Sequence, residues 1–358
     1  MSALLLTTLA LAADCVAPPI VAAPAMGSDS AATCLGADLD MAGRVFARFP
    51  ETGLSRGIEL SRLRTELQWA SDTASARLAI LPARSGGDDG YIGIAGEAFV
   101  PVIQIAEARY DVRPLGLSLA AGLVDDIALM PGQLAWQHIP IARPLLTDRG
   151  WTVRSDMGGW ASWTAPERYV TVTASITTGE GANRRERNNG VDTTVAVIGR
   201  PLGSNLVQIM AWGREGSTGL LQARNHRAGA TAWLQHDYVG AGLEAALGWG
   251  LAGDGSLAPG GTSVWARTGP EVPLVGWARF DLGTDARGVD DTAEQTILVG
   301  AGPRLPFKGR APAYIAIAYE GRAAQGNAAP IAGATGTTRS DLVFVQLSSR
   351  LRGAFALP

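Results

Sequence analysis

The chain has 358 residues and a formal net charge of −3, so no basic excess points to a nucleic-acid partner. Only 18% of the residues are charged while 47% are hydrophobic, and glycine (45) and tryptophan (10) are abundant. Beyond the N-terminus, no uninterrupted apolar stretch reaches the about 18 residues of a transmembrane helix, which excludes a helical membrane protein. If the chain meets a membrane, it must do so as a closed β-barrel, which satisfies every backbone group.

The N-terminal region predicts export. Residues 3–13 are apolar and end near the small-x-small site Ala10-Leu11-Ala12, so we predict a signal peptide over 1–13. This stretch lacks the usual preceding Lys or Arg, which leaves a buried N-terminal helix as the alternative. Residues 14–56, rich in Ala, Pro, Gly and Ser, predict a periplasmic extension with a short helical piece near 41–49. Cys15 and Cys34, the only cysteines, predict a disulfide there, with two unpaired thiols as the alternative.

From Gly57 onward the hydrophobic pattern has a period of two residues. Val343, Val345 and Leu347 alternate with Gln346 and Ser348, and other segments repeat this pattern. Successive strand side chains point to opposite faces, so each segment has one apolar and one polar face. A soluble β-sandwich would show the same alternation, but these segments are about 9 to 16 residues long, whereas globular strands average about 5 or 6. The pattern therefore favours strands that cross a bilayer.

We predict an all-β fold, a transmembrane antiparallel β-barrel over 57–358, with sixteen strands; fourteen or eighteen remain open because the region before 102 is irregular. The predicted strands are 58–69, 75–82, 91–100, 102–112, 115–124, 149–156, 167–177, 190–200, 205–213, 229–239, 242–250, 261–269, 272–282, 293–302, 311–321 and 340–355. From 102 onward long polar connections alternate with short ones, as in outer-membrane barrels with periplasmic turns and longer external loops.

The order of motifs from Gly57 to Phe355 resembles the phosphate-selective porin O and P family. The matching segments are Arg62-Leu63-Arg64, the strand from Ile105 to Pro114, Leu117 to Gly122, Asp148-Arg149-Gly150, Thr178 to Gly181 and Ile198 to Leu202. The resemblance implies a sixteen-stranded pore, commonly trimeric. It does not carry over phosphate selectivity, because the family depends on channel lysines and Lys308 is the only lysine here.

By alternation, a set of charged side chains should face the lumen as pore-lining residues, since an arginine facing lipid at mid-bilayer would cost about 2–4 kcal/mol. The set is Arg62, Arg64, Glu66, Glu107, Arg109, Arg154, Asp192, Arg279, Asp281, Glu294, Arg350 and Arg352. Because both signs occur, we expect a weakly selective pore; the alternative is that these residues are structural ladders that hold the wall.

Two further features concern the loops and the tryptophans. The connection from Asp125 to Asp148 is long and unusually apolar, which predicts either folding into the pore as a constriction or packing against a neighbouring subunit. Several tryptophans near predicted strand ends suggest aromatic girdles, with ordinary strand packing as the alternative. They are Trp151, Trp160, Trp163, Trp212, Trp233, Trp249 and Trp265.

The expected function is an outer-membrane porin for passive diffusion of small hydrophilic solutes or ions. A closed-lumen barrel that binds or anchors at the surface is the alternative. A barrel enzyme has little support, since His138, His226 and His236 are scattered and no Gly-x-Ser-x-Gly motif occurs. We expect no catalytic residue, cofactor or metal. The expected partners are outer-membrane lipid, the solutes, further copies in a homotrimer and the barrel-assembly machinery. The alternate residues Leu351, Gly353 and Phe355 resemble the C-terminal signal that this machinery recognises in its clients.

Overall fold

The computed structural model describes twelve ranges of the chain, beginning at Thr33. These are residues 33–50, 54–85, 98–138, 145–179, 181, 190–218, 223–250, 254, 256–289, 292–305, 313–325 and 339–357, with 50, 61, 83–85, 98–100 and 352–357 described as backbone only. The predicted signal peptide, 1–13, lies outside these ranges.

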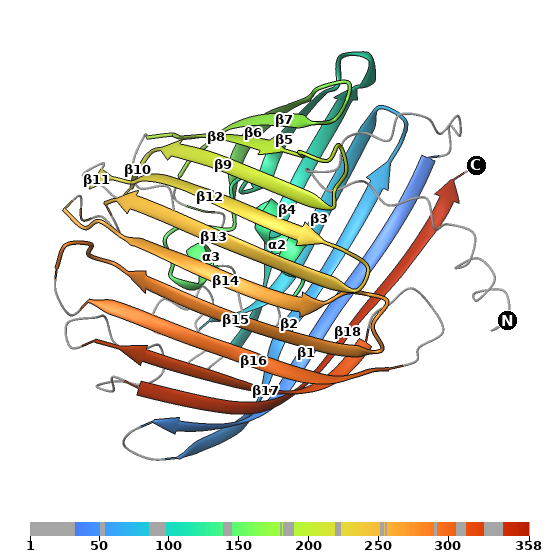
Figure 1. Ribbon diagram of the computed structural model, residues 1–358. Helices are drawn as coiled ribbons and strands as arrows, with labels where there is room; N and C mark the ends of the chain where they lie inside the picture. Colours follow the sequence, from blue (N-terminus) through green and yellow to red (C-terminus); the bar gives the residue numbers. More distant parts are fainter. Residues whose placement is uncertain are drawn as a thin grey trace, which may run out of the picture.

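Sixteen strands form one closed antiparallel barrel, as the sequence predicts. They are β1 (Thr33–Pro50), β2 (Ser55–Ala70), β3 (Ala74–Ser85), β4 (Ala98–Val112), β5 (Leu117–Asp125), β6 (Ser155–Thr164), β7 (Val170–Thr177), β8 (Asp192–Gly199), β9 (Val207–Glu215), β12 (His226–Gln235), β13 (Val239–Trp249), β14 (Gly260–Thr268), β15 (Leu274–Thr284), β16 (Ala293–Leu305), β17 (Ala313–Ala324) and β18 (Arg339–Leu357). Each pairs with its neighbour along the chain, and β1 pairs with β18 from Thr33↔Leu357 to Pro50↔Ser340, which closes the ring (Figure 1).

Short elements lie between some strands. They are the 3-10 turn η1 (Arg113–Leu115), the helices α2 (Met130–Trp136) and α3 (Leu145–Asp148), and a two-stranded ribbon of β10 (Ser217–Thr218) and β11 (Ala223–Arg224). Among the described residues, no helix is long and apolar enough to cross a bilayer.

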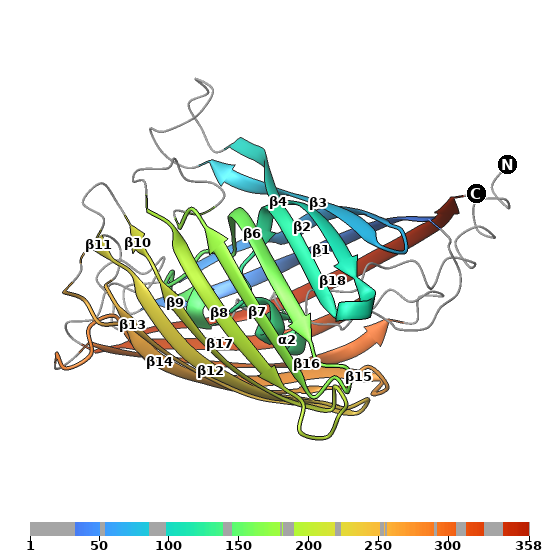
Figure 2. The ribbon, with the colours of Figure 1, turned by 90° about the horizontal axis from the view of Figure 1, so that it is seen from above.

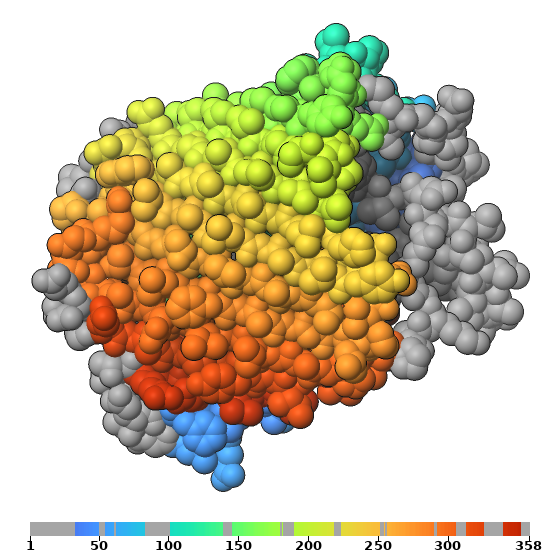
Figure 3. Space-filling model, in the orientation of Figure 1, coloured from blue at the N-terminus to red at the C-terminus, as the bar shows by residue number. Residues whose placement is uncertain are grey.

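The period-two pattern of the sequence becomes the two faces of the wall. In β17, Ile315 and Ile317 are exposed (41% and 65%), whereas Ala316 and Ala318 between them are buried (1% and 2%). The same alternation recurs in most of the strands, and large apolar side chains cover the outside of the barrel. Figure 3 shows one such face, formed from β12 to β17, as a continuous surface. An apolar outer belt of this kind is what hydrocarbon requires of a barrel.

Connection length separates the two ends of the barrel. At the end where β1 starts and β18 stops, the connections are 71–73, 113–116, 165–169, 200–206, 236–238, 269–273 and 306–312. At the other end they are 51–54, 86–97, 126–154, 178–191, 216–225, 250–259, 285–292 and 325–338. The predicted alternation of short turns and longer loops is confirmed, apart from the brief connection 51–54.

The predicted boundaries of the N-terminal half need correction. Residues 33–50 and 54–56, assigned to a periplasmic extension with a helical piece, belong instead to the barrel as β1 and the start of β2. Alanines and glycines interrupt the apolar face of β1 and hide its alternation. The described end of the predicted strand 91–100, residues 98–100, continues into 102–112 as one strand, β4, and residues 91–97 lie outside the described part. The predicted strand 149–156 lies further on, as β6. The count of sixteen is right because the missed β1 offsets the divided β4.

Cys34, at the start of β1, is buried and disulfide-bonded. Cys15 lies outside the described residues, so the predicted pairing of Cys15 with Cys34 remains a prediction.

Candidate functional site

The connection 126–154 between β5 and β6 folds into the barrel. Its helix α2 packs on β12 and β13, and Met130, Gln133, Ala135 and Trp136 are buried. Pro131 lies in the first turn of α2, and Gln137 ends the helix in the left-handed conformation (φ 63°). Of the two interpretations of this apolar loop, inward folding is therefore correct for its described residues.

Wall side chains fix the loop through its backbone. The Nε of Arg267 on β14 donates to the Ala135 carbonyl (2.9 Å), and the Nε of Arg227 on β12 donates to the Trp151 carbonyl (3.0 Å). The Trp151 indole N–H donates in turn to Asp285 Oδ1 (2.7 Å). The first two contacts give the carbonyls of Ala135 and Trp151, both buried residues, the partners that buried backbone groups require.

Ion pairs add a second set of attachments. Their partners lie at opposite ends of the loop, and the pairs are Arg214 with Asp126, Arg149 with Glu294, and Arg322 with Asp148 (3.5 Å). Burial lowers the pKa of Arg149, with Asp148 and Asp281 acting against it. The loop is thus held at its start by β9 and at its end by β16 and β17.

Most of the tryptophans expected in aromatic girdles instead point inward. The inward tryptophans are Trp151, Trp160, Trp212, Trp233 and Trp265, each at most 6% exposed. Of the predicted girdle set, Trp163 (44%) and Trp249 (37%) lie on the outside. The cause is strand parity: Trp160, for example, shares a face with the buried Ser162 and Thr164.

The inward rings build an apolar core beneath α2. Trp136 packs edge-on against Trp265 (5.6 Å between centroids), and His138 lies 5.1 Å from Trp277. Three inward tryptophans each face a glycine on the adjacent strand, in the pairs Trp212↔Gly229, Trp265↔Gly242 and Trp277↔Gly300. A Cβ at Gly229 would lie 2.7 Å from the Trp212 ring, so the glycine makes room for the indole. This pairing gives physical meaning to the high glycine and tryptophan content.

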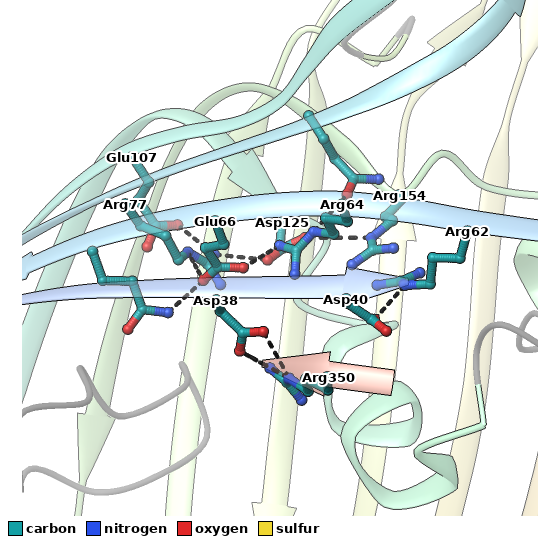
Figure 4. Close-up of polar contacts among 12 residues, drawn as sticks. Asp38, Asp40, Arg62, Arg64, Glu66, Arg77, Glu107, Asp125, Arg154 and Arg350 are labelled. Carbon is teal, nitrogen blue, oxygen red and sulfur yellow. Dashed lines mark hydrogen bonds and ion pairs between the residues drawn. The ribbon is translucent and has the colours of Figure 1, made fainter. Parts of the chain in front are cut away.

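A wall of paired charges occupies the other side of the barrel. In the ring order, β2 and β3 lie opposite β12 and β13, which carry α2. Figure 4 shows the charged side chains of this wall gathered along β1 to β4 and β18, together with the two ends of the loop. They are Arg62, Arg64, Arg77, Arg154 and Arg350, with Asp38, Asp40, Glu66, Glu107 and Asp125.

The contacts in this charged wall join different strands, both neighbours and, between β3 and β5, strands one apart. Arg350 donates from Nη2 to Asp38 Oδ2 (2.6 Å), which links β18 to β1, and Arg62 pairs with Asp40 across β2 and β1. Arg77 on β3 reaches Asp125 (2.7 Å) and Glu107 (3.6 Å). Five arginines thus face five carboxylates, and the formal charges of these ten groups cancel.

Arg154, just before β6, completes the charged wall from the loop side. Its Nε lies 3.9 Å from Asp125 Oδ1. Burial lowers the pKa of Arg154 to about 9; the charge of Asp125 raises it, and Arg64 and Arg62 lower it further. The guanidinium stays charged at neutral pH, so the group contributes positive potential where the loop meets the wall.

The predicted lumen residues divide into two groups. Arg62, Arg64, Glu66, Glu107, Arg154 and Arg350 meet in the charged wall. The remaining described ones lie apart: Arg109 with Asp111, Asp192 beside the Ser217 N–H, Arg279 with Asp281 beneath Trp136, and Glu294 with Arg149. The side chain of Arg352 lies outside the described part.

Four members of the charged wall were not predicted. Asp38 and Asp40 were missed because β1 was assigned to the extension, although they alternate with Leu39 and Met41. Arg77 lies inside the predicted strand 75–82 and was not assigned to the lumen, and Asp125 was taken as the first residue of the long loop. The short alternation over 38–41, although alanines and glycines interrupt it elsewhere in 33–50, was the signal that could have found the first two.

In sequence, no family model and no curated protein matches this chain. Solved structures do match in fold. The anion-selective porin from Comamonas acidovorans has 12% identity and a TM-score of 0.61, covering 90% of this chain and 99% of that one. The outer membrane channel DcaP of Acinetobacter baumannii has 10% identity and a TM-score of 0.58, with the same coverages. The trimer form of OmpT from Vibrio cholerae has 11% identity and a TM-score of 0.51, covering 89% and 100%. The chain therefore has the fold of these outer-membrane barrels.

Proposed function

We propose that this protein is an outer-membrane porin through which small hydrophilic solutes or ions diffuse passively. The observation that carries the proposal is the charged wall, which faces an inward loop inside a closed barrel with an apolar exterior. Charged side chains placed inside such a barrel make a path for hydrated solutes, while the outer belt meets lipid. The fold shared with a porin and with an outer membrane channel supports the same function.

The charge balance of the wall argues for weak ion selectivity. Five arginines and five carboxylates give the wall no net formal charge, whereas rings of one charge select strongly. A closer relation to the phosphate-selective porin O and P family is supported by the order of motifs from Gly57 to Phe355. Its phosphate preference is not part of the proposal, because Lys308 is the only lysine.

The inward loop is proposed as the constriction. Helix α2 and its aromatic core occupy one side of the barrel, so the space for solutes would lie along the charged wall on the other side.

Deleting residues 128–144 should remove α2 and raise the single-channel conductance in planar bilayers. Reversal potentials in a salt gradient should stay near zero. Unchanged conductance would contradict the constriction, and a purified barrel without stepwise conductance would favour the closed-lumen alternative.

The proposed location and assembly follow from the same function. A signal peptide over 1–13 would direct export, the barrel-assembly machinery would insert the chain, and the apolar belt would contact outer-membrane lipid. A homotrimer is proposed because OmpT, of similar fold, has a trimer form. Fractionation of membranes and chemical cross-linking test location and assembly separately.

A further inference from the structure

In the described residues, the outer part of the β3–β4 hairpin does not pair with either of the strands that flank it. On one side, β4 pairs with β5 only from Ala106↔Leu123 to Val112↔Leu117; the other side, between β2 and β3, is the one developed below. β2 pairs with β1 along nearly its whole length, from Cys34↔Ala70 to Arg48↔Ser55. It pairs with β3 only from Thr65↔Ile80 to Ala70↔Ser75. Further out, the described parts of β2 (55–64) and β3 (81–85) pair only with β1 and β4, respectively. Figure 2 shows β2 and β3 close together at their right ends and diverging toward the left.

We call this separation of β2 from β3 beyond Thr65 and Ile80 the fork, and the sequence contains its causes. The β3–β4 register shifts between Ala79 and Ile80, where Gln104 is an extra residue in β4, and the β1–β2 register shifts where Ser61 is an extra residue. Such bulges bend strands and end pairing. Just beyond the shift, Pro82 lies opposite Pro101, and a proline has no N–H to donate to a neighbouring strand. The separation of β2 from β3 is therefore a property of the chain itself.

The fork begins at membrane depth. A tilted strand crosses a bilayer in about 9–11 residues. Starting from the short-turn end, β2 pairs with β3 only from Ala70 to Thr65, which is fewer residues than a crossing needs. Unpaired backbone at membrane depth is tolerated only where it faces protein or a water-filled cavity. The unpaired edges 62–64 and 81–83 therefore need either protein or the hydrated lumen beside them, and the proposal below takes the lumen.

Polarity changes sharply across the fork. On its inner side, Arg64 Nε donates to Gln104 Oε1 (3.2 Å), a bridge from β2 to β4, and Arg62 pairs with Asp40. On its outer side, Leu60 (48% exposed) and Ile103 (50%) present apolar side chains. Arg62 and Arg64 are paired with Asp40 and Glu66, so an anionic head could bind here by replacing these carboxylates as the partner of a guanidinium group. The apolar side chains on the outer side suit a single apolar tail.

We propose that the fork between β2 and β3 is a lateral portal, through which single-chain anionic amphiphiles pass between the lumen and the outer leaflet. The head would exchange contacts with Arg62 and Arg64 while the tail leaves between the unpaired edges. The Arg64–Gln104 bridge acts as the latch on the inner side. This proposal rests on the proposed function in one respect, because it needs the barrel to lie in the outer membrane with a hydrated lumen.

A cysteine pair tests the portal by closing it. If the register of Thr65↔Ile80 continued outward, Leu63 would face Pro82, so a Leu63→Cys/Pro82→Cys disulfide should form only when the edges meet. In proteoliposomes of the full chain, we expect oxidation to abolish most of the flux of decanesulfonate, which stays ionised and crosses lipid poorly. Salt conductance should persist, and a reductant should restore the flux.

A second variant tests the latch without a cross-link. Gln104→Ala should raise decanesulfonate flux and leave salt conductance nearly unchanged. The matched control is Gln208→Ala on β9, another inward glutamine remote from the fork. If the disulfide fails to form, a bulky maleimide on Leu63→Cys should block the same flux.

The outcomes separate the two proposals. The portal would be overturned, and the porin function left intact, by one combination of results. In that combination the protein conducts salt, and neither closure of the fork nor Gln104→Ala alters the decanesulfonate flux. Loss of all conductance in the parent protein would overturn the porin function itself. Efficient cross-linking of two chains through Ile58→Cys, beside the fork, would show that a second copy covers this edge, and would also overturn the portal.

Discussion

At the scale of single residues, the pair of Asp38 and Arg350 joins the first strand to the last and lies in the charged wall. Arg350→Gln would leave the Asp38 carboxylate without this partner and should shift the reversal potential toward cation preference. Asp38→Asn should shift it by a similar amount toward anions, because it frees Arg350. Both shifts should shrink at high salt, which screens the charges. Each variant is the other's control, and shifts of the same sign would contradict the balance of charge.

His138 predicts a response to acid. It is buried against Trp136 and Trp277, and its pKa falls from 6.5 to about 3, first because of burial and then because of Arg267 and Arg304. The unfolded chain therefore binds more protons than the folded one between these values, so stability is full above pH 6.5 and declines toward pH 3. Urea midpoints followed by tryptophan fluorescence should drop over this window in the parent. His138→Gln should flatten the decline, whereas His236→Gln, at an exposed site, should not.

At the scale of elements, the end of the inward loop depends on Trp151. Trp151→Phe keeps most of the ring and loses the N–H that reaches Asp285, a loss of about 1 kcal/mol for one hydrogen bond. We expect faster hydrogen exchange over 145–154 and noisier single-channel currents, while the barrel itself stays folded. Trp163→Phe, on the outer face, is the control. Equal exchange in both variants would show that Trp151 does not hold the loop.

The elements that the sequence predicted well are those with a strong period-two pattern. β17 and β18 alternate clearly and were placed within a few residues. β1 was missed because Ala37 and Gly43 weaken its apolar face and Gly36 and Ala42 interrupt its polar face. The division of β4 near Pro101 has a different cause, since proline is disfavoured in strand interiors and here marks the fork. The inward parity of the tryptophans could have been predicted from alternation, since Trp160 shares its face with the polar Ser162 and Thr164. The girdle expectation was wrong because it used position near strand ends instead.

At the scale of the whole molecule, the interior divides into an apolar side and a charged side. The aromatic residues under α2 form a core like that of a soluble protein, while the charged wall keeps its groups in pairs. Under the proposed porin function, placing the loop against one wall would leave the opposite wall for polar passage. The outer surface is apolar over most of the strands, because strand alternation is independent of what fills the inside.

The apolar exterior makes a direct prediction about where the barrel resides. Leu243 lies in the middle of β13 and is 50% exposed on the outer face. Leu243→Arg should destabilise the barrel in lipid bilayers by about 2–4 kcal/mol, the cost of arginine at the midplane of a membrane barrel. Unfolding by denaturant in phospholipid vesicles measures this cost, with Leu243→Ala as the control for lost side-chain volume. The penalty should arise only if hydrocarbon surrounds this strand. If Leu243→Arg is no less stable than Leu243→Ala, this face of β13 lies in water, and the basis for a membrane pore is removed.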